Sequence, residues 1–221
     1  MEWVQEDFDR FVLGNEIIGF FDKPIKLKSG RMSNWYANWR TFTNYVSQID
    51  PLADFVIDFT KHLGLEPNCF YGVPEGATKL GIITQYKWGK QGNSNILPMG
   101  RGKPKEHGAL IDKYFVGEPE GKTIILEDVT TTGGSLIKEI EKLQSIYVNV
   151  IAAFGLTHRN QKRDDGLTVK EAVGKFNVNY YAMSNAVDLL PRIPCYDKIA
   201  KSVEKEFEEY GEVELKMRGN Q

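Results

Sequence analysis

Cysteine is scarce in this chain, which has only Cys69 and Cys195 among its 221 residues. Two thiols are too few for a disulfide framework, and their spacing is not that of a metal site. Long apolar runs are also lacking, as is an apolar core in the N-terminal stretch MEWVQEDFDR, so neither a membrane span nor a signal peptide is expected. We therefore predict two buried thiols in a reducing compartment, and a cytoplasmic protein that contacts no membrane.

Charge of one sign is not in excess either. The chain has 28 Lys and Arg residues against 30 Asp and Glu residues, which gives a formal net charge of −2. Such a chain has no global attraction for nucleic acid, so no nucleic-acid partner is expected and any anion must be bound locally. Internal repeats and domain linkers are also lacking. The length and the 41% hydrophobic content predict one well-buried α/β domain over residues 1–221.

The apolar pattern predicts helices and strands along the chain. Helices are expected over 2–13, from Asp50-Pro51 to Gly64, after the turn at 74–77, from Ser135, and around 196–207. Strands are expected on both sides of a turn at Ser29-Gly30, and at 69–73, 124–126, 148–154 and 178–183. Tyr86 and Tyr196 are expected on the packed faces of their helices. The charged end, Glu208–Gln221, is expected to fray.

The stretch Lys122–Ser135, KTIILEDVTTTGGS, carries the clearest chemical pattern. A buried strand is followed by two acids, a loop of threonines and glycines, and a helix. Glycines let the backbone approach a ligand, and a helix N-terminus offers free N–H groups to a phosphate. The acids can bind sugar hydroxyls or, through water, a divalent metal. This order predicts a phosphosugar site.

A simpler interpretation of the same stretch is a strand-to-helix turn with Ser135 as the N-cap. Turn chemistry alone does not explain an acid pair at the end of a buried strand. The loop is neither a GxxxxGK[ST] sequence nor a GxGxxG fingerprint, so the common nucleotide-binding loops are not present here.

The order LEDVTTTGGS resembles the motif with which type I phosphoribosyltransferases bind phosphoribosyl diphosphate (PRPP). The resemblance implies that Glu127 and Asp128 hold the ribose hydroxyls, that Asp128 takes part in catalysis, and that the loop wraps the 5′-phosphate. The implied PRPP-binding residues of this stretch are Glu127, Asp128, Thr130, Thr131, Thr132, Gly133, Gly134 and Ser135. Mg²⁺ is the implied cofactor, bound through PRPP and through water on Asp128, with no direct protein ligand assigned.

A second block, KSGRMSNWYANWR at residues 28–40, resembles the N-terminal signature of the orotate phosphoribosyltransferases. The resemblance implies that Lys28 contacts substrate close to the reacting centre as a catalytic residue, and that Tyr36 lies against the pyrimidine ring. The departures from the family pattern are Asn34, Ala37 and Asn38. The alternative for this block is a hairpin with exposed basic residues.

The segment GVPEGA, residues 72–77, lies where type I enzymes have a loop at the diphosphate. The resemblance implies diphosphate contacts for Gly76 and Ala77. Glu75 stands where some orotate enzymes have Lys, and an acid beside a diphosphate is unfavourable unless a cation offsets it.

The segment RGKPKEHG, residues 101–108, resembles the orotate-enzyme lid RKExKxHG. The resemblance implies a flexible lid loop at 89–112. Its implied catalytic residues are Arg101, Lys103, Lys105 and His107. Gly102 and Lys103 depart from the family pattern, and a solvated connector without chemistry is the alternative.

A polar segment, LTHRNQ, follows the strand expected at 148–154. Ligands of open α/β sheets bind beyond the carboxyl ends of the strands. The resemblance implies that Arg159 binds the pyrimidine, with His158 in place of a family acid. The implied orotate-binding residues are then Lys28, Tyr36, Thr131 and Arg159. A surface-basic segment is the alternative.

Together these segments imply a type I phosphoribosyltransferase-like fold, with a central, mainly parallel sheet flanked by helices, an N-terminal hood at residues 1–45 and the lid. The implied reaction transfers ribose 5-phosphate from PRPP to orotate, in a homodimer whose lid is shared across subunits. Two alternatives stay open: a type I phosphoribosyltransferase for another nucleobase, and a non-catalytic PRPP-binding regulator. A regulator should show a basic face or a helix-turn-helix extension, and the sequence has neither.

Overall fold

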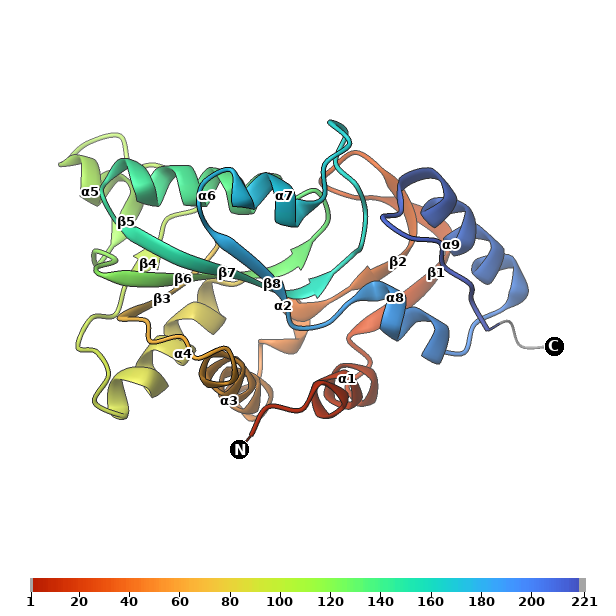
Figure 1. Ribbon diagram of the computed structural model, residues 1–221, viewed down its shortest axis with the longest axis horizontal. Helices are drawn as coiled ribbons and strands as arrows, with labels where there is room; N and C mark the ends of the chain where they lie inside the picture. The colour runs from red at the N-terminus through yellow and green to blue at the C-terminus, as the bar shows by residue number, and fades with distance from the viewer. Residues whose placement is uncertain (1, 219–221) are drawn as a thin grey trace.

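The computed structural model describes residues 2–218, and a four-stranded parallel sheet lies at its centre (Figure 1). The strand order is β3-β6-β7-β8, and every neighbouring pair is parallel. The bounds of these strands are β3 Cys69–Gly72, β6 Lys122–Thr130, β7 Asn149–His158 and β8 Asn179–Ala182. The predicted α/β fold with a mainly parallel sheet is therefore confirmed.

Helices cover both faces of this sheet (Figure 1). Side chains alternate between the faces along β6: Ile124 and Leu126 join the cluster under α3 and α4, whereas Ile125 packs with α6 and α7. The bounds of these helices are α3 Val46–His62, α4 Thr78–Lys90, α6 Gly134–Ser145 and α7 Val169–Gly174. Because both faces are buried, β6 carries a continuous apolar run, Ile124–Leu126, directly before its two acids.

The hood forms an antiparallel hairpin, β1 Ile18–Lys26 with β2 Met32–Ala37, at one end of the sheet (Figure 1). The predicted turn at Ser29-Gly30 lies between the two strands, and Gly30 has a φ of +89°, which glycine adopts without strain. The flanking elements are α1 Gln5–Gly14, α2 Trp39–Phe42, α8 Ala186–Leu189, a 3₁₀ turn at Leu190–Arg192 and α9 Asp197–Tyr210. Helix α9 packs against the hairpin and so places the C-terminal part of the chain beside the hood.

The predicted lid has an ordered base. Strand β4, Met99–Gly100, pairs with β5, Phe115–Val116, and α5, Leu110–Tyr114, precedes β5. Residues 89 and 90 still belong to α4. The loop between the two short strands is therefore shorter than the range 89–112 predicted from the sequence.

Two local predictions about helices were wrong. Helix α3 begins at Val46, not at Asp50-Pro51, so Pro51 lies inside the helix. The additional first turn is exposed at Val46 and carries no apolar periodicity, so the pattern did not mark it. Tyr86 of α4 is exposed, because the face of this helix that meets β3 carries Gln85 and Trp88: Gln85 Oε1 accepts from the Phe70 N–H, and Trp88 packs against the Phe70 ring.

The C-terminal predictions also need correction. Tyr196 precedes α9 and is exposed. The predicted fraying after Glu208 was wrong for residues 209–218, which are packed against the rest of the protein. Leu215 and Met217 are buried in the main core, and the Met217 N–H donates to Glu204 Oε1 at 2.9 Å. Residues 219–221 lie outside the described part of the chain. Two buried apolar side chains thus anchor a segment whose charged composition predicted a solvent-exposed tail.

Cys69 and Cys195 are free and buried, as predicted. Burial raises the pKa of the Cys69 thiol to about 12, which keeps it protonated and unreactive at neutral pH. Among residues 2–218, no helix is both long and apolar enough to cross a membrane.

Candidate active site

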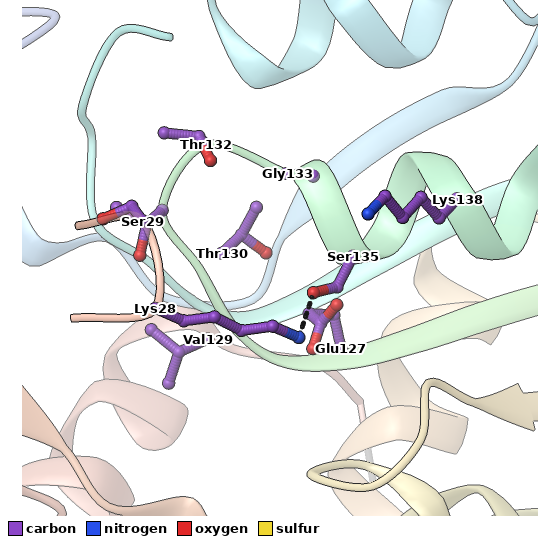
Figure 2. A pocket seen from close by; sticks show the side chains of 11 residues that line it. Lys28, Ser29, Glu127, Val129, Thr130, Thr132, Gly133, Ser135 and Lys138 are labelled. Atoms are coloured by element: carbon purple, nitrogen blue, oxygen red, sulfur yellow. Dashed lines mark hydrogen bonds between the residues drawn. The ribbon is translucent and has the colours of Figure 1, made fainter. Parts of the chain in front are cut away.

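The loop after β6 forms one wall of a pocket, which we call the loop pocket (Figure 2). Gly133 has a φ of +69°, and a Cβ there would approach Val169 Cγ1 to 3.1 Å, so both backbone conformation and space favour glycine. Helix α6 begins at the next residue, with its free N–H groups at the pocket. The residues that line the loop pocket are Lys28, Ser29, Glu127, Val129, Thr130, Thr131, Thr132, Gly133, Gly134, Ser135 and Lys138.

A second pocket, which we call the hood pocket, adjoins the first. Its lining residues are Ile25, Lys26, Leu27, Lys28, Tyr36, Arg40, Pro74, Glu127, Asp128, Val129, Thr131, Ser135 and Arg159. The two pockets share Lys28, Glu127, Val129, Thr131 and Ser135. Figure 2 shows Lys28 reaching across this shared region, where its Nζ donates a hydrogen bond of 2.8 Å to Ser135 Oγ. The hood and the β6–α6 loop therefore enclose one continuous site.

The two acids of the motif are buried at the floor of this site. Asp128 is fixed on both sides: its Oδ1 accepts from the Val129 N–H at 2.9 Å, and its Oδ2 accepts from Arg40 Nε at 3.2 Å. Burial, and then the neighbouring Asp128, raise the pKa of Glu127 well above its ordinary value, although Lys28 and Arg40 oppose the shift. The floor thus holds one fixed carboxylate and one carboxyl that resists ionisation.

Replacing Glu127 by glutamine should stabilise the free protein at neutral pH. Because the folded-state pKa of Glu127 is raised, the folded state binds its proton more tightly than the unfolded state. The contribution of Glu127 to stability therefore falls as pH rises above about 4.5. Glutamine cannot ionise and avoids this loss. Thermal melts from pH 4 to pH 8 should show an advantage of Glu127→Gln that grows with pH. An advantage independent of pH, or one matched by exposed Glu118→Gln, would contradict this.

Arg159 lies in the wall of the hood pocket with its charge already paired. Its side chain is 1% exposed, and its guanidinium donates to Glu206 Oε1 at 2.7 Å and lies 3.5 Å from the centre of the Trp35 ring. Ser33 Oγ accepts a further hydrogen bond at 2.7 Å. Burial lowers the pKa of Arg159 to about 10, against the opposing effect of Glu206. Its predicted orotate contact stays a prediction.

The predicted diphosphate turn lies against the acids. A Cβ on Gly76 would come within 2.2 Å of Asp128 Oδ2, so only glycine fits there without displacing the carboxylate. Ala77 is buried at the start of α4, and neither residue lines the two pockets.

The structure does not bring the lid cations into either pocket. Lys103, Lys105 and His107 are exposed, and Arg101 Nε donates to the Asp112 carbonyl at 3.1 Å. The base of the lid touches the diphosphate turn, because a Cβ on Gly102 would approach Glu75 Oε1 to 2.5 Å. None of the four predicted lid residues lines the loop pocket or the hood pocket, so their role stays a prediction.

Sequence reasoning missed two residues that organise the site. Glu206 of α9 lies between Val203 and Phe207 on the apolar face of its helix, and a lone acid at such a position was a usable signal. Arg163 donates to the Thr132 carbonyl of the β6–α6 loop and also contacts Asp165. Nothing in the local pattern distinguishes Arg163 from a solvated surface arginine.

A metal centre made of protein ligands is not present in residues 2–218, where no three His, Cys, Asp or Glu side chains form a suitable group. The adjacent acids Glu127 and Asp128 still suit a divalent cation that brings its own phosphate and water ligands.

A strand that ends in two acids, a hydroxyl- and glycine-rich loop that opens a helix, and an antiparallel hood over that loop define a phosphoribosyltransferase of the α/β class. A comparison with protein-family models found no match. Among curated proteins, orotate phosphoribosyltransferase of a Bradyrhizobium species (strain BTAi1) is 33% identical over 150 residues, which cover 62% of this chain and 75% of the relative. The chain belongs to the orotate phosphoribosyltransferase family.

Solved structures agree on the fold. The orotate phosphoribosyltransferase of Francisella tularensis has a TM-score of 0.68 at 20% identity, covering 93% of this chain and 99% of that one. The UMP synthase of Leishmania donovani has a TM-score of 0.72 at 18% identity, covering 94% of this chain and 43% of that one. The predicted family and fold are therefore confirmed.

Proposed function

We propose that this chain transfers ribose 5-phosphate from PRPP to orotate, giving orotidine 5′-monophosphate and diphosphate. The observation that carries the proposal is the continuity of the two pockets: one offers an anion-binding loop, the other a basic, tyrosine-lined space, and Lys28 spans the join. A phosphosugar in the loop pocket would place its C1 toward a base in the hood pocket.

The position of each residue in the two pockets suggests its role in binding. Backbone N–H groups of Thr131–Ser135 and the α6 N-terminus hold the 5′-phosphate. Glu127 and Asp128 accept hydrogen bonds from the ribose hydroxyls, and Tyr36 packs on the base. Mg²⁺, bound through PRPP oxygens and water, would supply charge neutralisation for the departing diphosphate.

Lid closure completes the site in this proposal. Arg101, Lys103, Lys105 and His107 would neutralise the diphosphate as it leaves, and the closed lid would exclude water from the activated sugar. We further propose a homodimer in which the lid serves the neighbouring subunit, and a cytoplasmic location for the enzyme.

The pairing of Arg159 with Glu206 favours one alternative, a base without a carboxylate. The assay that tests the proposal follows orotate by its ultraviolet absorbance, with PRPP and Mg²⁺ present and with each omitted in turn. We expect consumption that requires both. Retained PRPP binding with no orotate consumption would contradict the proposed base and favour the alternative.

Replacing Arg163 by glutamine should raise the KM for PRPP about fivefold, since losing a charged donor to the Thr132 carbonyl costs about 1 kcal/mol and loosens the phosphate loop. The KM for orotate should stay unchanged, because Arg163 does not line the hood pocket. Steady-state kinetics check both values, with the exposed Arg10→Gln as control. Equal changes in the KM for PRPP and the KM for orotate would show that Arg163 only supports the fold.

A further inference from the structure

Four cationic side chains line the hood pocket: Lys26, Lys28, Arg40 and Arg159. Two of them are already committed. Arg159 is paired with Glu206, and Lys28 donates to Ser135 toward the loop pocket. The other two, Lys26 and Arg40, are the candidate partners for a carboxylate on the base.

Glu206 cannot readily release Arg159 to a substrate. Its carboxylate accepts three hydrogen bonds inside the protein: from Arg159 at 2.7 Å, from Gln161 Nε2 at 2.6 Å and from Ser33 Oγ at 2.8 Å. Both charged side chains are almost fully buried. Moving the guanidinium to a substrate would leave a buried carboxylate without its counter-ion, which is strongly unfavourable.

Arg40 has the opposite character. Its Nε donates to Asp128 Oδ2 at 3.2 Å, which orients the guanidinium, and 60% of its side chain is exposed. Over residues 2–218, neither of its terminal amino groups donates a hydrogen bond. These two amino groups form the planar fork that matches a carboxylate.

The backbone under Arg40 is rigid. Its neighbour Trp39 is fully buried and donates from Nε1 to Thr157 Oγ1 at 2.9 Å, and Phe42 is buried at the other end of α2. Asn38 caps this short helix by accepting from the Thr41 N–H. Because its backbone is held in place, Arg40 should lose less conformational entropy on binding than Lys26, which lies at the end of strand β1.

Tyr36 connects Arg40 with the base position. Burial lowers the pKa of Arg40, but Asp128, Tyr36 and Glu127 together raise it above its ordinary value. Tyr36 also contributes to the pKa of Arg159, and the three side chains line the same pocket. A base that packs on Tyr36 would therefore share the hood pocket with Arg40.

We propose that Arg40 pairs through its terminal amino groups with the carboxylate of the base, while Arg159 is a positioning residue held by Glu206. This inference rests on the proposed function, whose base is orotate. Arg40 would then determine specificity for a carboxylated base and, through Nε, hold Asp128 at the ribose.

The test separates the carboxylate from the ring. Steady-state kinetics give the KM for orotate, and competition gives the inhibition constant of its uncharged 6-carboxamide. In Arg40→Gln we expect the KM for orotate to rise 10- to 100-fold, and at least tenfold more than the inhibition constant of the carboxamide, because both ligands share any loss that comes from the Asp128 contact. Lys26→Gln is the matched control: it removes the same charge from the same pocket, and we expect less than a threefold change for both ligands.

Three results would overturn the inference. Equal weakening of orotate and carboxamide in Arg40→Gln would mean that Arg40 acts only through Asp128. A larger orotate-selective loss in Lys26→Gln would assign the carboxylate to Lys26. Wild-type protein that consumes no orotate would overturn the proposed function and this inference together, whereas wild-type turnover with either of the first two results overturns this inference alone.

Discussion

Glu206→Ala should lower the free energy of unfolding by about 3–5 kcal/mol, because it leaves the buried guanidinium of Arg159 without its counter-ion. The loss extends beyond one pair. Gln161 and Ser33 also donate to this carboxylate, and alanine would leave both without that acceptor. The substitution therefore removes the polar contacts that link helix α9 to Ser33 of the hairpin and to Arg159 and Gln161 after β7.

Urea denaturation at pH 7 measures this effect. Glu208→Ala is the matched control, since it removes the same charge from an exposed position on the same helix and should change stability by less than about 0.5 kcal/mol. A Glu206→Ala protein within 1 kcal/mol of the Glu208→Ala protein would show that the pair contributes little to the fold. Glu206→Gln, which keeps an acceptor oxygen, should lose less than alanine does.

Gly76→Ala should reduce kcat/KM by about 100-fold or more, an effect of roughly 3 kcal/mol on the transition state. The new Cβ would lie 2.2 Å from Asp128 Oδ2 and 2.4 Å from its Cγ, well inside contact distance. Asp128 must then move away from Arg40 and from the ribose position. A displacement of this size at a reacting centre is sufficient for such a loss.

A double-mutant cycle identifies the cause. If Gly76→Ala acts by displacing Asp128, then Gly76→Ala combined with Asp128→Asn should be little worse than the more damaging single variant. Gly14→Ala, where a Cβ meets nothing within 4 Å, controls for the general effect of replacing glycine. Fully additive losses, or a fall in melting temperature that parallels the fall in activity, would contradict the displacement.

The sequence predicted those parts of the fold that local pattern determines. The run Ile124–Leu126, the two acids and Gly133 together mark the β6–α6 loop, because each reflects a local requirement of burial, charge or backbone conformation. The family, the parallel sheet and the two strands on either side of Ser29-Gly30 followed from such segments and are confirmed.

The features that the sequence did not predict depend on contacts between segments that are distant along the chain. Glu206 meets Arg159 across 47 residues, and Arg163 meets the Thr132 carbonyl across 31 residues. Neither partner carries a local signal of its pairing. The tail after Glu208 looked solvated because two buried side chains, Leu215 and Met217, are too few to make a period.

The most direct test of the whole account is a competition among bases. Orotate, uracil, adenine and hypoxanthine are mixed at equal concentration with PRPP, Mg²⁺ and wild-type protein, and the nucleotide products are identified by mass. We predict orotidine 5′-monophosphate as the product, with none when PRPP is omitted. Formation of a different nucleotide in place of orotidine 5′-monophosphate, or of no nucleotide at all, would contradict the assignment of this site to orotate.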